Sequence, residues 1–170
     1  CNKKEIADFR FSITDFGETV YAIEALDGQL ITNKIICAPI VKEGFYESDI
    51  ANDILKIVVV NRYNNAPIAK AFIKNFGINQ GAIASSVAHD SHNIVAIGVD
   101  DESICKAVNL VIKEQGGISA VSNTKEMVLG LPVAGLMSND DGYKVAAAYT
   151  AIDKMVKEEL GSSLSAPFMT

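Results

Sequence analysis

Apolar and polar residues alternate through the first half of the chain, and this pattern predicts strands. Residues 19–26 (TVYAIEAL) and 29–41 (QLITNKIICAPIV) flank Asp27-Gly28, a dipeptide typical of a tight hairpin turn. The run 54–63 (ILKIVVVNRY) is β-branched and nearly continuous, which predicts a central strand buried on both faces. The first 53 residues therefore form a strand-rich entry to the domain.

A short helix is predicted at 67–75, directly after this central strand. Pro67 suits a first helical turn, Phe72 and Ile73 would share a helical face, and Gly77 is a natural C-terminal stop.

The second half of the chain gives one order of elements twice: strand, tight turn, strand, helix. Together the two units, 81–114 and 117–160, predict one α+β domain over residues 1–170. Its architecture is a layered sandwich of mostly antiparallel or mixed sheet, with the helices laid on its outer faces. The glycine-rich signatures of nucleotide-binding folds do not occur. The expected elements are strands 81–89 and 92–99 and a helix at about 101–114 in the first unit, and strands 118–122 and 126–133 and a helix at 143–160, capped at Asn139 or Asp140, in the second.

Composition narrows the classes of function. The chain has 170 residues, 49% of them hydrophobic, and a formal net charge of −6. An acidic surface repels phosphate backbones, so we expect no nucleic-acid partner. The sequence holds three widely spaced cysteines and lacks an apolar run long enough for a membrane span, so we expect a cytoplasmic protein.

Both histidines lie in the segment SSVAHDSHN, residues 85–93. If Asp90-Ser91 is a two-residue turn, His89 and His92 flank it, with their Cβ atoms about 4.5–5.5 Å apart. The turn could then be an exposed polar tip, a binding or catalytic contact, or part of a metal site. A metal site needs three or four ligands, and these two imidazoles are the only metal-ligand candidates here. A serine-hydrolase triad is disfavoured, because the segment lacks the GxSxG signature.

Few other side chains suggest a role in binding or catalysis. Arg62, at the end of the central strand, either binds an anion or pairs with Asp8 or Glu47. The loop 131–138 (LPVAGLMS) could line a pocket or pack on another domain. Cys105, on the first predicted helix, is interpreted as a packing residue rather than a nucleophile.

Several long motifs carry a family resemblance. The segments IAKAFIKNFGINQ, GAIASSVAHDSHNIVAIGVDDESICKAVNLVIKEQGG and LPVAGLMS closely resemble the C-terminal domain of bacterial adenine deaminase, of the amidohydrolase superfamily. The resemblance runs from about Ile6 to the final PFMT and so covers nearly the whole chain. It implies hydrolysis of adenine to hypoxanthine and ammonia, in purine salvage or adenine catabolism, by a metal-activated hydroxide. The implied metal is divalent, manganese or iron with zinc as a further option, and its ligands would lie in an upstream (β/α)8 barrel.

This resemblance implies that the chain is a fragment and that it is inactive alone. Its partners would be the barrel domain, adenine and further copies in a homo-oligomer, with no membrane. The turn with both histidines is expected to face the barrel mouth. Tyr63 stands where the family pattern has histidine, so substrate preference could differ. Two other roles stay open: a docking and oligomerisation domain, or a small-molecule (purine) binding module. The expected site residues are His89, Asp90 and His92 for catalysis or positioning, and Ser86, Ser91, Asn93 and Arg62 for substrate binding.

Overall fold

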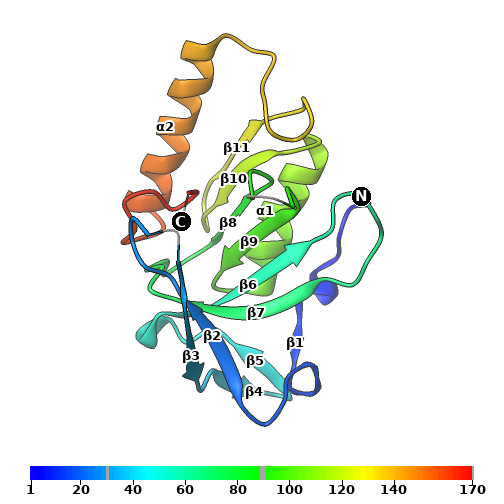
Figure 1. Ribbon diagram of the computed structural model, residues 1–170, viewed down its shortest axis with the longest axis vertical. Helices are drawn as coiled ribbons and strands as arrows, with labels where there is room; N and C mark the ends of the chain where they lie inside the picture. Colours follow the sequence, from blue (N-terminus) through cyan, green and yellow to red (C-terminus); the bar gives the residue numbers. More distant parts are fainter. Residues whose placement is uncertain (30, 89–90, 170) are drawn as a thin grey trace.

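A large mixed sheet forms the centre of the molecule. A computed structural model of the chain describes residues 1–29, 31–88 and 91–169. The strands of this sheet are β2 (Val20–Glu24), β3 (Asn33–Cys37), β6 (Ile54–Val60), β7 (Ala69–Lys74), β8 (Ala82–Ser85), β9 (Ile94–Gly98), β10 (Gly117–Val121) and β11 (Glu126–Gly130). Among the described residues the eight strands lie in the order β11-β10-β8-β9-β6-β7-β2-β3 (Figure 1). Neighbouring strands are antiparallel except for β2 and β7, which run parallel.

Helices and a second sheet cover the two faces of this sheet. Helix α1 (Asp101–Lys113) packs on one face, together with the small sheet β1-β5-β4, and helix α2 (Gly142–Glu158) packs on the other. The strands of the small sheet are β1 (Phe11–Ser12), β4 (Ile40–Lys42) and β5 (Phe45–Glu47). Short 3-10 helices complete the described elements: η1 (Ile6–Phe9), η2 (Ile13–Asp15) and η3 (Ile50–Asn52).

Alternation along the strands explains why both faces are covered. In β8, Ala82 and Ala84 belong to the core under α1, while Ile83 belongs to the core under α2. The α+β class, the mixed sheet and the two strand-strand-helix units are thus confirmed. The two helices lie on opposite faces of the sheet, so the second unit is turned over relative to the first.

The prediction of a helix at 67–75 is wrong, because most of this segment is strand β7. Phe72 and Ile73 are both buried, but they point to opposite faces of the sheet and enter different cores. The strand lies between β6 and β2, which saturate its two edges with backbone hydrogen bonds. Tertiary pairing therefore overrides a local pattern that also fits a helix.

Other boundaries need smaller corrections. The segment expected as one strand at 29–41 divides between β3 and β4, which belong to different sheets. Asp27-Gly28 does lie in a turn, closed by the N–H of Gln29 donating to Leu26 O at 3.0 Å. The cap of α2 is Asp141, one residue beyond the expected range, and its carboxylate accepts the N–H groups of Tyr143 and Lys144.

The β4–β5 hairpin lies at the opposite end of the molecule from β11 (Figure 1). Its turn contains Glu43 and Gly44, with φ values of +53° and +82°. A Cβ atom added at Gly44 would meet no other atom within 4 Å. Among the described residues, no helix has the length and apolar character needed to cross a membrane.

Candidate functional site

Most of the expected site residues gather at one edge of the large sheet. Strands β6, β8 and β11 end at this edge, and β9 and β10 begin there. Three connecting segments therefore meet: the residues after β6, the β8–β9 loop (86–93), and the turn 133–137 after β11. A cleft of about 430 Å³, lined mainly by apolar side chains, opens beside them between α2 and the sheet, and Val87 of the loop lines it.

The β8–β9 connection is longer than the expected two-residue turn. Strand β8 ends at Ser85 and β9 begins at Ile94, so the predicted strand ends at 89 and 92 are wrong. Ser85 pairs with Val95. Continuing that register places Ala88 opposite His92, and the N–H of His92 does donate to Ala88 O at 2.9 Å. His89 and Asp90 lie outside the described residues, and so does the predicted His89–His92 pair.

His92 is the histidine whose surroundings the structure describes. Its backbone has φ of +49°, in the left-handed region that costs a non-glycine residue about 1 kcal/mol or more. Its carbonyl accepts the Nε–H of Arg62 at 2.7 Å. Its ring atom Nδ1 is buried and has no hydrogen-bond partner among the described residues. Buried polar atoms are normally satisfied, so this nitrogen is a candidate to bind a group from outside the described residues.

Arg62 binds backbone carbonyls rather than the expected carboxylates. Besides His92 O, its guanidinium donates to the carbonyls of Ala134 and Gln115, the latter at 3.5 Å. The suggested pairing with Asp8 or Glu47 is wrong. Asp8 accepts the N–H of Glu5, and Glu47 pairs with Lys56.

Tyr63 contacts the same guanidinium. Its hydroxyl accepts from Arg62 Nη2 at 3.2 Å, and its ring centroid lies 4.7 Å from Arg62 Cζ. A tyrosine here thus adds a hydrogen-bond acceptor and an aromatic face to the cation.

The polar residues expected to bind substrate occupy different environments. Ser86 is fully buried, and its hydroxyl donates to Gly135 O at 2.6 Å and accepts the N–H of Gly117 at 2.8 Å. This hydroxyl therefore holds loops together. Ser91 is exposed, and Asn93 accepts the N–H of Arg62 at 3.4 Å. Whether these two side chains contact a substrate stays a prediction.

Sequence reasoning identified the loop 131–138 but not the contacts that its turn, residues 133–137, makes with Arg62 and Ser86. Val133 and Met137 form an isolated β-bridge, and between them Ala134 and Gly135 have φ of +58° and +76°. This conformation turns the carbonyl of Ala134 to Arg62 and that of Gly135 to Ser86. The segment LPVAGLMS signalled a loop, but contacts made to backbone carbonyls have no signature in side-chain identity.

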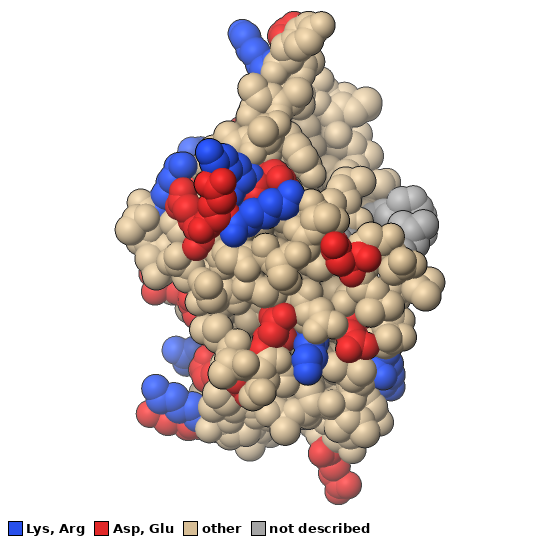
Figure 2. Space-filling view, turned by 90° about the vertical axis from the view of Figure 1, so that its left-hand side faces the viewer, with Lys and Arg blue, Asp and Glu red and all other residues tan. Residues whose placement is uncertain are grey.

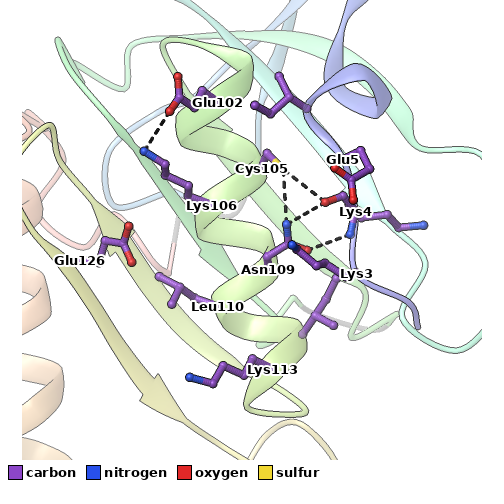
Figure 3. A pocket seen from close by; sticks show the side chains of 12 residues that line it. Lys3, Lys4, Glu5, Glu102, Cys105, Lys106, Asn109, Leu110, Lys113 and Glu126 are labelled. Atoms are coloured by element: carbon purple, nitrogen blue, oxygen red, sulfur yellow. Dashed lines mark hydrogen bonds and ion pairs between the residues drawn. The ribbon is translucent and has the colours of Figure 1, made fainter.

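A second cavity, of about 540 Å³, lies on the outer side of α1 and contains Cys105 (Figure 3). Asn109 fixes the N-terminal segment there, since its side-chain amide both accepts the N–H of Lys4 and donates to Lys4 O, each at 2.9 Å. Burial raises the pKa of the Cys105 thiol, which opposes the formation of a reactive thiolate. This agrees with the interpretation of Cys105 as a packing residue.

A catalytic metal does not fit the donor groups that the structure describes. Within residues 1–29, 31–88 and 91–169, no group of three or more His, Cys, Asp or Glu side chains is arranged to hold a metal ion. No chemical step of this chain is therefore assigned to a metal.

Comparison with known proteins assigns this chain to a family. The family described as "Adenine deaminase C-terminal domain" matches residues 29–170. An adenine deaminase from Borreliella burgdorferi is 44% identical over 171 residues, which cover 100% of this chain and 31% of that protein. One from Methanothermobacter thermautotrophicus is 46% identical, covering 99% of this chain and 32% of the relative. One from a Sulfurovum species is 52% identical over 148 residues, covering 87% of this chain and 26% of the relative. The chain spans about a third or less of these relatives, and it belongs to the family of adenine deaminase C-terminal domains.

Proposed function

We propose that this chain is the C-terminal part of an adenine deaminase and that its β8–β9 loop contributes to the substrate site of the complete enzyme. The reaction is hydrolysis of adenine to hypoxanthine and ammonia. The metal that activates the water would be held by the remaining two thirds of the protein, where the family resemblance implies a barrel domain. The role of this chain is to bind or orient the purine, or the attacking water, at the mouth of that domain.

One observation carries this proposal: the Nδ1 atom of His92 is buried and has no hydrogen-bond partner within the part of the chain that the structure describes. The backbone of His92 is held in an unfavourable conformation, and its carbonyl is fixed by a cation. Strained residues held by their surroundings are concentrated at functional sites. An imidazole nitrogen can donate to, or accept from, the nitrogen edge of a purine. The sequence offers His89 and Asp90 as further candidates for the same task.

The test uses the full-length protein that contains this domain. His92→Asn is the most informative change, because asparagine tolerates the left-handed backbone but removes the imidazole. We expect kcat/KM for adenine to fall about 100-fold, the range for loss of one positioned polar group at a reacting centre. Glu43→Asn, at a similar positive φ of +53° in the exposed turn of the β4–β5 hairpin, is the matched control for the change of side chain at such a backbone position. Unchanged kcat and KM in His92→Asn would refute a role of His92 in the reaction.

A second test concerns the chain alone. We expect the purified 170-residue chain to release no ammonia from adenine, with or without added Mn²⁺ or Fe²⁺, because its described residues offer no metal-binding cluster. We also expect weak binding of adenine in calorimetry, because half of a site buries little of the ligand. Turnover by the chain would contradict the assignment of the metal site to the rest of the protein. Tight binding of adenine would favour a purine-binding module.

A docking and oligomerisation role is the second candidate, and exposed apolar side chains favour it. Ile36 on β3, Met137 in the turn 133–137 and Tyr143 on α2 are 72%, 57% and 89% exposed. Figure 2 shows one dense cluster of charged groups on the face that contains α2, with further charged groups scattered between uncharged residues over the rest of that face. Exposed apolar side chains mark contact with other protein where they form one continuous patch. Variants of His92 that keep full activity but change the mass of the assembly would support this candidate over the first.

A further inference from the structure

Arg62 was expected to bind substrate, but its contacts indicate another task. The guanidinium is half-buried, and its hydrogen bonds among the described residues go to three backbone carbonyls and one tyrosine hydroxyl. The carbonyls belong to three different segments: the β8–β9 loop, the turn that follows α1, and the turn 133–137. A single cation therefore joins three loops that are far apart in the sequence.

The close approach of the turn 133–137 to Arg62 depends on Gly135. A Cβ atom placed on Gly135 would lie 2.2 Å from Arg62 Nη1 and 2.5 Å from Cζ. No side chain can occupy that volume while the guanidinium stays in place. The same glycine carbonyl accepts from the buried Ser86 at 2.6 Å, so the turn is fixed from two sides. Ala134, which supplies a carbonyl to Arg62, is itself held at a positive φ of +58°.

The contacts of Arg62 also hold the backbone around His92. Arg62 Nε holds the His92 carbonyl at 2.7 Å, and the backbone N–H of Arg62 donates to the side chain of the next residue, Asn93. The orientation of the His92 ring depends on its left-handed backbone conformation. That conformation is stabilised by the bond from Arg62, so the guanidinium acts on the ring without touching it.

We propose that Arg62 is the positioning residue of this site: its guanidinium fixes the carbonyl of His92 and the turn 133–137 in one arrangement, and so presents the His92 imidazole to the substrate in a single orientation. The proposal rests on the function proposed for His92. Arginine suits this task because its planar group carries five N–H donors pointing in several directions, which an ammonium group cannot reproduce. The turn 133–137 becomes part of the site through the same contact.

Two changes in the full-length protein disturb the arrangement from opposite sides. Arg62→Lys keeps the positive charge but loses the planar set of donors. Gly135→Ala keeps Arg62 and displaces its guanidinium. Gly28→Ala is the matched control for the second change, because Gly28 has a similar φ of +68° but would meet no atom within 4 Å. We expect kcat to fall about 10- to 100-fold in Arg62→Lys and Gly135→Ala, as for loss of residues that orient a reacting group. KM should change much less, and Gly28→Ala should behave as wild type.

Three further readouts separate positioning from general damage. The methyl NMR signal of Met137 and the ring signals of His92, identified by their absence in Met137→Leu and His92→Asn, should shift in both variants and not in Gly28→Ala. The double variant Arg62→Lys/Gly135→Ala should lose no more activity than the stronger single variant, because both changes remove the same contact. Added guanidinium ion should partly restore kcat in Arg62→Ala, and methylammonium should not.

The outcomes distinguish this proposal from the function on which it rests. If His92→Asn lowers activity but Arg62→Lys and Gly135→Ala do not, Arg62 is not a positioning residue and the proposed function stands. If the NMR signals stay unchanged in both variants, the coupling between Arg62 and His92 is refuted whatever the activity. If His92→Asn leaves activity intact, the proposed function fails, and the positioning role of Arg62 fails with it.

Discussion

Lys56 gives the most direct test of the packing described above. Its side chain is completely buried on β6, where Nζ lies 2.8 Å from Asp101 Oδ1 and 3.4 Å from Glu47 Oε2. The lysine thus joins the large sheet to the first residue of α1 and to the small sheet. At an effective dielectric constant of about 20, attraction to Asp101 alone amounts to about 6 kcal/mol, opposed by several kcal/mol of desolvation for each ion.

Lys56→Met replaces the cation with an apolar side chain of similar length. The main effect is to leave the Asp101 carboxylate largely buried without its cation, which typically costs about 3–5 kcal/mol of unfolding free energy. We expect about 3 kcal/mol at pH 7, because the Asp101 side chain is 17% exposed and water relieves part of the cost. Urea unfolding, followed by circular dichroism, measures the change from the transition midpoint. Lys144→Met, on the exposed face of α2, is the control and should stay within about 0.5 kcal/mol of wild type.

Acid provides an internal check on the cause. Burial raises the pKa of the Asp101 carboxyl even in the presence of Lys56, and removing the lysine raises it further. The penalty of Lys56→Met is therefore present at neutral pH and shrinks as the pH falls through that raised value, where the carboxyl becomes neutral. Adding Asp101→Asn to Lys56→Met should recover stability at pH 7 for the same reason. A penalty that is independent of pH and unaffected by Asp101→Asn would refute the electrostatic explanation.

Two further predictions concern ionisable groups. Burial raises the pKa of Cys105, so at pH 8 a disulfide reagent should modify the exposed Cys1 quickly and Cys105 only slowly until urea unfolds the chain; a fast thiol that disappears in Cys105→Ser would contradict this. The N–H and hydroxyl of Ser165 hold the pKa of Asp27 below its usual value of 3.8. The stability that this contact adds is present above pH 3.8 and lost in stronger acid, so Asp27→Asn should be less stable than wild type at pH 6 and equally stable near pH 2; a constant difference in melting temperature between those pH values would argue against it.

The elements that sequence pattern predicted well are those whose signals are local and long. The helix expected at 101–114 is α1, since acidic residues at its start, a Gly-Gly pair at its end and helical spacing of apolar residues all agree. The central strand in 54–63 is β6, buried on both faces as its β-branched run indicated. By contrast, β7 lies between a sequence neighbour and β2, a distant strand, and six residues of local pattern do not reveal such a partner.

The candidate site shows the same limit. The importance of SSVAHDSHN and of LPVAGLMS was visible in their residue types, but their connection was not. Ser86, whose contact with a substrate stays a prediction, joins Gly117 to Gly135. Arg62, expected to pair with an acid, binds carbonyls. Every residue supplies the same carbonyl group, so only the folded backbone decides which carbonyls converge on the Arg62 guanidinium.

The β4–β5 hairpin is a suitable site for attaching a label to this protein. Its reversal at Glu43-Gly44 is open to solvent and lies far from β11 and the loops beside it (Figure 1). A fluorophore or an affinity peptide inserted there would report on tumbling, assembly or capture while leaving the chemistry of the distant loops undisturbed. Surface immobilisation through that hairpin would orient every molecule alike, with its functional end pointing into the solution.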